Sequence, residues 1–302
     1  MDVLSRIAGI ILPVFLITAA GYCYARMRGE QVTEDMAGLS RVNVELLSPV
    51  LLFSALASKD FDLVANLPLI LAGLLISLGS GLLAWPIARL LGYDPRTFVP
   101  PMIYNNCGNM GVPLAVLAFG ASALSEAVAM FVASTLVYFS VGVWIIESAG
   151  KGPRLSMRRT LANPMILSVL LGTLFAALRI PLPEVLLQAM RMLGEASIPI
   201  MLIALGVRMV DVRFTHWRIG VLGAIVCPLS GLVVAWAIDH WLSLSAMQRG
   251  QMYLFASLPP AVFSFMIANA YKQEPDKVAA IVMLGNLAAV VFVPLGLWIG
   301  IQ

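Results

Sequence analysis

Long apolar segments separated by short polar connectors make up most of the 302-residue chain. A helix needs about 20 mostly apolar residues to cross the hydrocarbon core of a bilayer. The connectors between these segments are too short to hold a soluble domain. The pattern therefore predicts an all-α polytopic membrane protein with ten membrane-spanning helices, at residues 7–25, 39–57, 67–91, 98–119, 123–147, 161–180, 184–207, 218–240, 249–270 and 278–300.

A polar break at residues 148–160 divides the chain into two halves with five predicted helices each. Four short stretches of the first half recur in the same order in the second half, which indicates a duplication. One example is "RVNVELLSP" at 41–49 and "RMLGEASIP" at 191–199, which share an R-x3-E-x3-P pattern. Since five is an odd number, the second half must enter the membrane from the opposite side. We therefore predict two inverted repeats, residues 1–150 and 151–302, an arrangement typical of secondary transporters.

Composition and charge agree with a membrane location and suggest an orientation. Hydrophobic residues make up 60% of the chain and charged residues 12%, against about 25% charged in soluble proteins. If the N-terminus is outside, 14 of the 19 Lys and Arg residues fall in cytoplasmic connectors, as the positive-inside rule requires. We therefore expect both termini outside the cytoplasm, in a bacterial inner membrane. The net charge of +3 and the lack of a basic tract give no reason to expect a nucleic-acid partner.

The stretch "YNNCGNMGVP", residues 104–113, places three asparagines, two glycines and a proline inside the fourth apolar segment. Non-helical backbone at membrane depth is tolerated only where it is buried in protein or lines a cavity. A break here would leave helix ends whose free N–H groups suit an anion such as a carboxylate. The predicted substrate-binding residues in this stretch are Asn105, Asn106, Asn109, Gly111 and Pro113.

The repeat partner of this stretch is "FASLPPAVFS", residues 255–264, in the ninth segment. Pro259 and Pro260 should interrupt the helix, and Ser257 and Ser264 supply hydroxyl groups. Small residues and prolines also serve packing alone in membrane helices. Because both halves carry such a cluster at the same position, we favour one binding site where two broken helices cross, and we add these four residues to it.

Both broken segments resemble those of the auxin efflux carrier family, within the bile acid/auxin/arsenite transporter superfamily. The resemblance lies in "NNCGNMGVPL" followed by "FG", and in "SLPPAVFSFMIANAY" followed by "PD", and the ten segments extend it over the whole chain. The family includes plant auxin carriers and bacterial carriers assigned to malate or malonate. This chain has Ser264 where the plant carriers are expected to have a proline, which leaves the geometry of the ninth segment open.

The resemblance implies a fold like that of sodium–proton antiporters and bile-acid symporters, with crossing fourth and ninth helices. Spans 1, 2, 6 and 7 would form a scaffold that also dimerises, and spans 3–5 and 8–10 a mobile transport domain. The implied function is transport of small organic acid anions, mono- or dicarboxylates, by an elevator-type motion. The expected partners are this anion, the lipid bilayer and a second copy of the chain.

Ion coupling is less well defined by the sequence. Glu45 and Glu195 are acids inside apolar segments, where a carboxylate is a functional candidate. Each follows an arginine by four residues, Arg41 and Arg191, so a structural ion pair is the competing interpretation. Further candidates for binding an ion are Ser134 and Thr135.

Three alternatives define what else the chain could be. A sodium- or proton-coupled carrier of the bile-acid symporter type would predict acidic residues at the crossing helices, and the ninth segment has none. An enzyme would show nucleophile–base or metal-ligand motifs, and a receptor a folded domain outside the bilayer. Since the sequence shows none of these, we expect a non-enzymatic transporter without a cofactor or metal.

Overall fold

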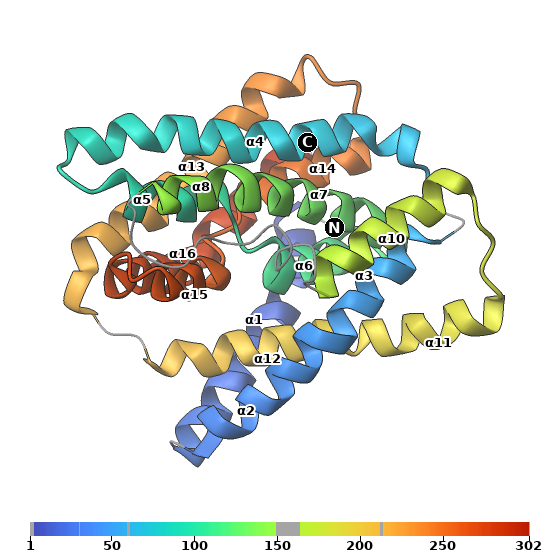
Figure 1. The fold of residues 1–302 in the computed structure, drawn as a ribbon, viewed down its shortest axis with the longest axis horizontal. Coiled ribbons are helices and arrows are strands. Elements are labelled where there is room, and N and C mark those ends of the chain that lie inside the picture. The colour runs from blue at the N-terminus through green and yellow to red at the C-terminus, as the bar shows by residue number, and fades with distance from the viewer. Residues whose placement is uncertain (1–2, 30, 59–60, 149–163, 212–213, 302) are drawn as a thin grey trace.

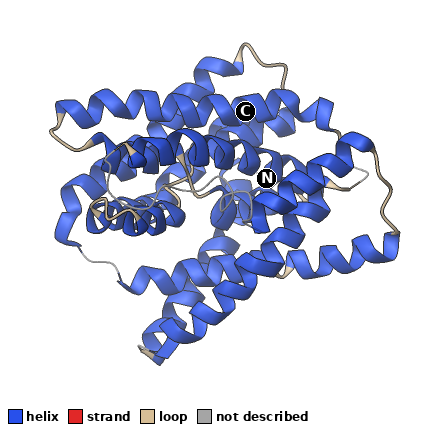
Figure 2. Cartoon of the chain, in the orientation of Figure 1, coloured by secondary structure: helices blue, strands red, loops and turns tan. Residues whose placement is uncertain are grey.

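The computed structural model describes residues 3–29, 31–58, 61–148, 164–211 and 214–301, and in this part of the chain it consists of helices and connecting loops (Figures 1 and 2). The predicted central break, and with it Lys151, Arg154, Arg158 and Arg159, lies outside the described residues. Helical structure occupies every one of the ten apolar segments. The α-helices are α1 (Val3–Arg28), α2 (Gln31–Val42), α3 (Ser48–Leu56), α4 (Leu63–Leu90), α5 (Pro95–Ile103), α6 (Val112–Phe119), α7 (Leu124–Val137), α8 (Val143–Glu147), α10 (Pro164–Leu178), α11 (Glu184–Glu195), α12 (Ser197–Arg208), α13 (Trp217–Asp239), α14 (Ala246–Ala256), α15 (Val262–Ala270) and α16 (Pro275–Ile301).

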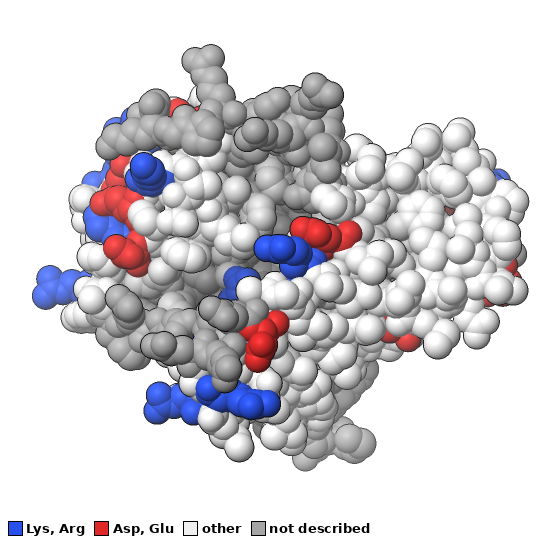
Figure 3. All heavy atoms as spheres, turned by 60° about the horizontal axis from the view of Figure 1, so that its bottom comes forward, with Lys and Arg blue, Asp and Glu red and all other residues white. Residues whose placement is uncertain are grey.

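Six helical stretches are long and apolar enough to cross a membrane by length and composition: 35–56, 63–90, 121–147, 184–208, 217–239 and 275–301. Their outward faces carry large apolar side chains. Leu82 of α4 is 75% exposed and Trp236 of α13 is 66% exposed. Figure 3 shows a wide uncharged area on the right of the view, whereas Lys, Arg, Asp and Glu gather toward the left and centre. A surface this apolar fits a lipid environment, since soluble monomers rarely expose large apolar patches.

Three π-helical turns interrupt the regular helices within the described residues. They are Asn43–Leu47 between α2 and α3, Cys107–Gly111 before α6, and Tyr138–Gly142 between α7 and α8. Such turns insert one extra residue into a helix and often occur at functional sites.

The helices pack most closely within two groups. In the first, α1 lies against α12, and α3 lies against both α10 and α11. In the second, α13 packs on α16 and α4, and α4 also packs on α5 and α7. In Figure 1, α4 runs along the top, whereas α2, α11 and α12 lie at the bottom, and the short helices α5, α6, α14 and α15 lie between these layers.

The contact between α1 and α12 depends on glycine. A Cβ atom at Gly206 of α12 would overlap the carbonyl oxygen of Thr18, and one at Gly21 of α1 would overlap the carbonyl oxygen of Ile203. Small residues of this kind allow helix backbones to approach closely in a membrane, where packing rather than water exclusion drives association. The two glycines therefore set the distance between α1 and α12.

We expect Gly206→Ala to lower the midpoint of thermal unfolding of the detergent-purified protein, since overpacking costs about 1–3 kcal/mol. Gly38→Ala is the matched control, because the space around Gly38 is open and Ala is the better helix former. An unfolding midpoint unchanged by Gly206→Ala would show that α1 and α12 are not packed backbone to backbone.

Candidate functional site

Two helices are interrupted near the middle of the molecule. The first break covers residues 104–106, between the end of α5 and the π-helical turn that begins at Cys107. The second covers residues 257–261, between α14 and α15. Pro259 and Pro260 account for the second break, because proline has no N–H to donate and its ring clashes with the preceding helical turn. The breaks therefore lie in the two stretches that the sequence singles out.

The two breaks cross, and their backbones hydrogen-bond to each other. The Asn106 N–H donates to the Pro259 carbonyl at 2.7 Å, and the Ala261 N–H donates to the Tyr104 carbonyl at 2.9 Å. Between these bonds, Asn105 and Pro260 form an isolated antiparallel bridge. Backbone polar groups that the interruptions remove from the helices are thus partly satisfied by each other, as burial in an apolar protein requires.

Side chains reinforce the crossing. The Asn106 amide nitrogen donates to the Asn286 side-chain oxygen at 2.9 Å, and the Asn286 amide nitrogen donates to the carbonyls of Val282 at 2.8 Å and Pro260 at 3.3 Å. Asn105 donates to the carbonyl of Phe255, which lies at the end of α14. Asn286 in α16 therefore links both breaks, a role that the sequence analysis missed. Its only sequence signal is an amide inside a long apolar helix.

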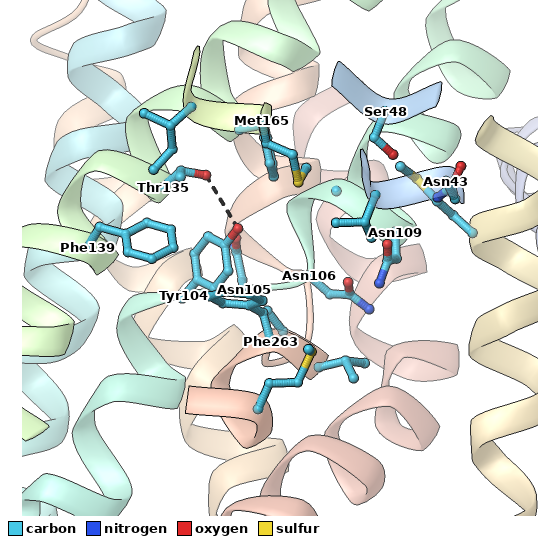
Figure 4. A pocket seen from close by; sticks show the side chains of 18 of the residues that line it. Asn43, Ser48, Tyr104, Asn105, Asn106, Asn109, Thr135, Phe139, Met165 and Phe263 are labelled. Atoms are coloured by element: carbon cyan, nitrogen blue, oxygen red, sulfur yellow. Dashed lines mark hydrogen bonds between the residues drawn. The ribbon is translucent and has the colours of Figure 1, made fainter. Parts of the chain in front are cut away.

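A cavity of about 150 Å³ opens beside the crossing. Asn105, Asn106, Gly108 and Asn109 line it from the first break, and Ala261, Val262 and Phe263 from the second. Figure 4 shows Asn43, Ser48 and Asn109 on one side of the cavity and Thr135 and Phe139 on the other. Tyr104 of the first break and Met266 of α15 also line it. The remaining lining residues come from helices outside the crossing: Asn43, Val44, Ser48, Phe131, Thr135, Phe139, Met165, Ile166, Met201 and Arg208.

Each π-helical turn of the described chain contributes to this cavity. Asn43 and Val44 belong to the first turn, Gly108 and Asn109 to the second, and Phe139 to the third. An extra residue in the helix shifts the side chains that follow it around the axis. The turns therefore place side chains toward the cavity that regular helices would direct elsewhere.

Unpaired backbone donors occur at two helix starts that line this cavity. The N–H groups of Gly108 and Asn109, and those of Val262 and Phe263, have no hydrogen-bond acceptor among the described residues. All four residues line the cavity. Unpaired N–H groups at a helix N-terminus carry a partial positive charge and bind anions readily. The side chain of Asn109 likewise has no protein hydrogen bond in the described part of the chain, so its amide is available to a solute.

The predicted site residues divide into those that line the cavity and those that support it. Asn105, Asn106, Asn109 and Thr135 line it, and the Thr135 hydroxyl lies 3.3 Å from that of Tyr104. Gly111 lies against Leu258 and Phe255, where a Cβ would crowd both side chains. Pro259 and Pro260 support the crossing, because their carbonyl oxygens accept hydrogen bonds from the Asn106 N–H and the Asn286 amide. The other predicted residues, which do not line the cavity, are Pro113, Ser134, Ser257 and Ser264.

The two acids inside apolar segments do not reach this cavity. Glu45 and Glu195 are both exposed at the surface. Neither forms the expected ion pair in the described chain: the only such pairs that involve an arginine or a lysine there are Arg249–Asp239 and Lys277–Glu274. Arg191 instead donates to the Ser58 hydroxyl at 3.2 Å. The competing interpretation, a structural ion pair at spacing i,i+4, therefore does not hold for either acid in the described chain, and a role in ion coupling stays a prediction.

Comparison with known proteins gives the family. A family model described as "Membrane transport protein" matches the chain twice, over residues 7–155 and 151–299. The chain belongs to this membrane transport family, which includes the auxin efflux carriers, and the resemblance found in the sequence is thereby confirmed. The protein is accordingly a membrane transporter.

Two relatives match along almost their whole length. An "Uncharacterized transporter" of Methanothermobacter thermautotrophicus is 26% identical, over 94% of this chain and 95% of its own. A "Putative malonate transporter" of Rhizobium meliloti is also 26% identical, over 95% of this chain and 93% of its own. A family and relatives named as transporters point away from an enzyme.

We expect Asn286→Ala to destabilise the protein by about 1–3 kcal/mol, because it leaves the buried Asn106 amide without its partner. Thermal unfolding in detergent measures this effect. Asn269→Ala is the control, since Asn269 is exposed on α15. Equal stability of the two variants would mean that Asn286 does not hold the crossing together.

Proposed function

We propose that the protein is a secondary transporter of small organic acid anions, and that it binds them where the two broken helices cross. The observation that carries this proposal is the set of unpaired N–H groups at Gly108, Asn109, Val262 and Phe263, which line one cavity together with asparagine amides. A carboxylate offers two oxygens that accept hydrogen bonds, and it matches the partial positive charge of two helix starts. The name of the Rhizobium meliloti relative, a malonate transporter, points to the same class of solute.

The membrane topology is part of the proposal. We infer ten crossing segments in two inverted repeats, residues 1–150 and 151–302, with both termini outside the cytoplasm of a bacterial cell. The two matches of one family model to successive halves support the division. Equivalent positions of the halves also meet in space: the hydroxyls of Ser48 and Ser197 lie 3.0 Å apart across a separation of 149 residues.

An elevator-type motion fits the packing. The helices α1, α2, α3, α10, α11 and α12 would form the static scaffold, which also dimerises, and the second packing group, with α5, α6, α14 and α15, would carry the crossing. Since the cavity has walls from both groups, sliding of one group past the other would move the crossing relative to the scaffold and expose it to each side in turn.

Asn109→Ala should strongly reduce binding and uptake of mono- and dicarboxylates in proteoliposomes, because it removes an amide that contacts no protein partner. Folding should be unaffected for the same reason. Asn106→Ala should lose transport as well, but its bond to Asn286 means that stability must be measured alongside. The control is Asn269→Ala, which lies on the surface.

Two results would contradict the proposed site. Parental uptake rates in both Asn109→Ala and Asn106→Ala would place the site elsewhere. Equal affinity for a carboxylic acid anion and its neutral methyl ester would remove the argument from helix-terminal charge.

We expect uptake to proceed equally well when sodium is replaced by choline. In the described chain no acidic residue lines the cavity, and no group of three or more His, Cys, Asp or Glu residues is placed to hold an ion. Uptake that requires sodium, measured in proteoliposomes with matched membrane potential, would instead favour the coupled carrier of the bile-acid symporter type.

A further inference from the structure

The cavity carries a positive charge on its scaffold side. Arg208, the last residue of α12, is the single charged residue among the described residues that line the cavity. No carboxylate of the described chain lies within ion-pair distance of it, although Glu45 and Arg41 share a neighbouring hollow with it. Arg208 is also exposed to solvent, so its guanidinium is hydrated and its charge is available to an anion that enters the cavity.

A second unsatisfied group lies in the same wall. Asn43 is 5% exposed, lines the cavity from the first π-helical turn, and its side-chain oxygen has no hydrogen-bond partner among the described residues. Buried amides of folded proteins are nearly always paired. An unpaired amide in the wall of a cavity therefore marks a place where a solute, or water held by it, completes the hydrogen bonds.

We propose that Arg208 and Asn43 form an anion subsite on the scaffold side of the cavity, which binds the second acidic group of a compact dicarboxylate. This inference rests on the proposed function, in which the crossing binds the first carboxylate. The guanidinium group offers paired donors that match carboxylate geometry, and its charge does not depend on pH in the physiological range. The Asn43 amide can donate to the same group, because its nitrogen and oxygen can exchange places by rotation.

The two subsites come from different packing groups, and this gives the inference a mechanistic consequence. The crossing asparagines belong to the group that would move, whereas Arg208 and Asn43 belong to the group that would stay. A dicarboxylate would therefore bridge the groups in the present arrangement and would lose its second contact when the crossing slides away. A monocarboxylate has no second acidic group, so it would lose no such contact when the crossing slides.

A competing occupant is an acid with a bulky apolar body. The cavity adjoins a second hollow of about 190 Å³ lined by Phe131, Phe139, Met165 and Val169, among others. That hollow offers no unpaired polar group, whereas the main cavity offers the buried, unpaired amide oxygen of Asn43 and the charge of Arg208, which has no counter-ion in the described chain. The observations therefore favour a second acidic group over an apolar extension, and the experiment below includes both.

The test measures binding of malonate, its monomethyl ester and phenylacetate to the purified full-length protein at neutral pH. The ester keeps the malonate skeleton but has a single charge. We expect malonate to bind the parent about tenfold or more tighter than the ester. Arg208→Gln should remove this preference by weakening malonate alone, and Arg208→Lys should retain part of it. Arg218→Gln is the matched control, since Arg218 is exposed like Arg208 but lies outside the lining residues.

Several results would overturn the subsite. If Arg208→Gln weakens the binding of malonate and of the ester equally, or of neither, then Arg208 does not bind the second carboxylate. In that case the proposed function still stands if Asn109→Ala weakens the binding of both. If phenylacetate binds more tightly than malonate and Arg208→Gln leaves it unchanged, the apolar hollow is the second subsite. If the parent binds none of the three acids, both the subsite and the proposed function are wrong.

Discussion

The pairing of two interrupted helices is the constraint on which the rest of the structure depends. Buried backbone that leaves a helix must find other partners, because unsatisfied N–H and C=O groups are expensive away from water. Here the bonds from Asn106 to Pro259 and from Ala261 to Tyr104 supply those partners at the crossing point. The N–H groups just beyond the crossing remain unpaired, and the residues that carry them line the cavity. The same geometry therefore stabilises the breaks and creates the donors.

This arrangement separates residues that build the crossing from residues available to a solute. Gly111, Pro259 and Pro260 allow close approach and end helices. The side chains of Asn105 and Asn106, by contrast, donate hydrogen bonds to other parts of the protein. Asn109 has no such partner. The asparagine-rich stretch of this chain thus combines two roles within five residues, and only the hydrogen-bond pattern tells the roles apart.

The sequence was sufficient to predict helices in the ten apolar segments and the location of both breaks, because Pro, Gly and Asn clusters act locally on the backbone. The partners of the breaks could not be predicted in the same way. Asn286 reaches the crossing from another helix, and Asn43 and Arg208 reach the cavity beside it. Their approach depends on packing and on π-helical turns that no local pattern reveals. The ion pairs that the spacing allowed for Glu45 and Glu195 do not form for a related reason: spacing permits a pair, but an exposed acid gains little from one.

The central claim is that helix-terminal N–H groups at the crossing hold an organic anion. The most direct test is an experimentally determined structure of the protein in a lipid environment with malonate bound. We predict carboxylate density beside the crossing, with its oxygens about 2.7–3.2 Å from the backbone nitrogens of Gly108, Asn109, Val262 or Phe263. Density for the anion at another site, or continuous helices through residues 104–106 and 257–261, would contradict the account.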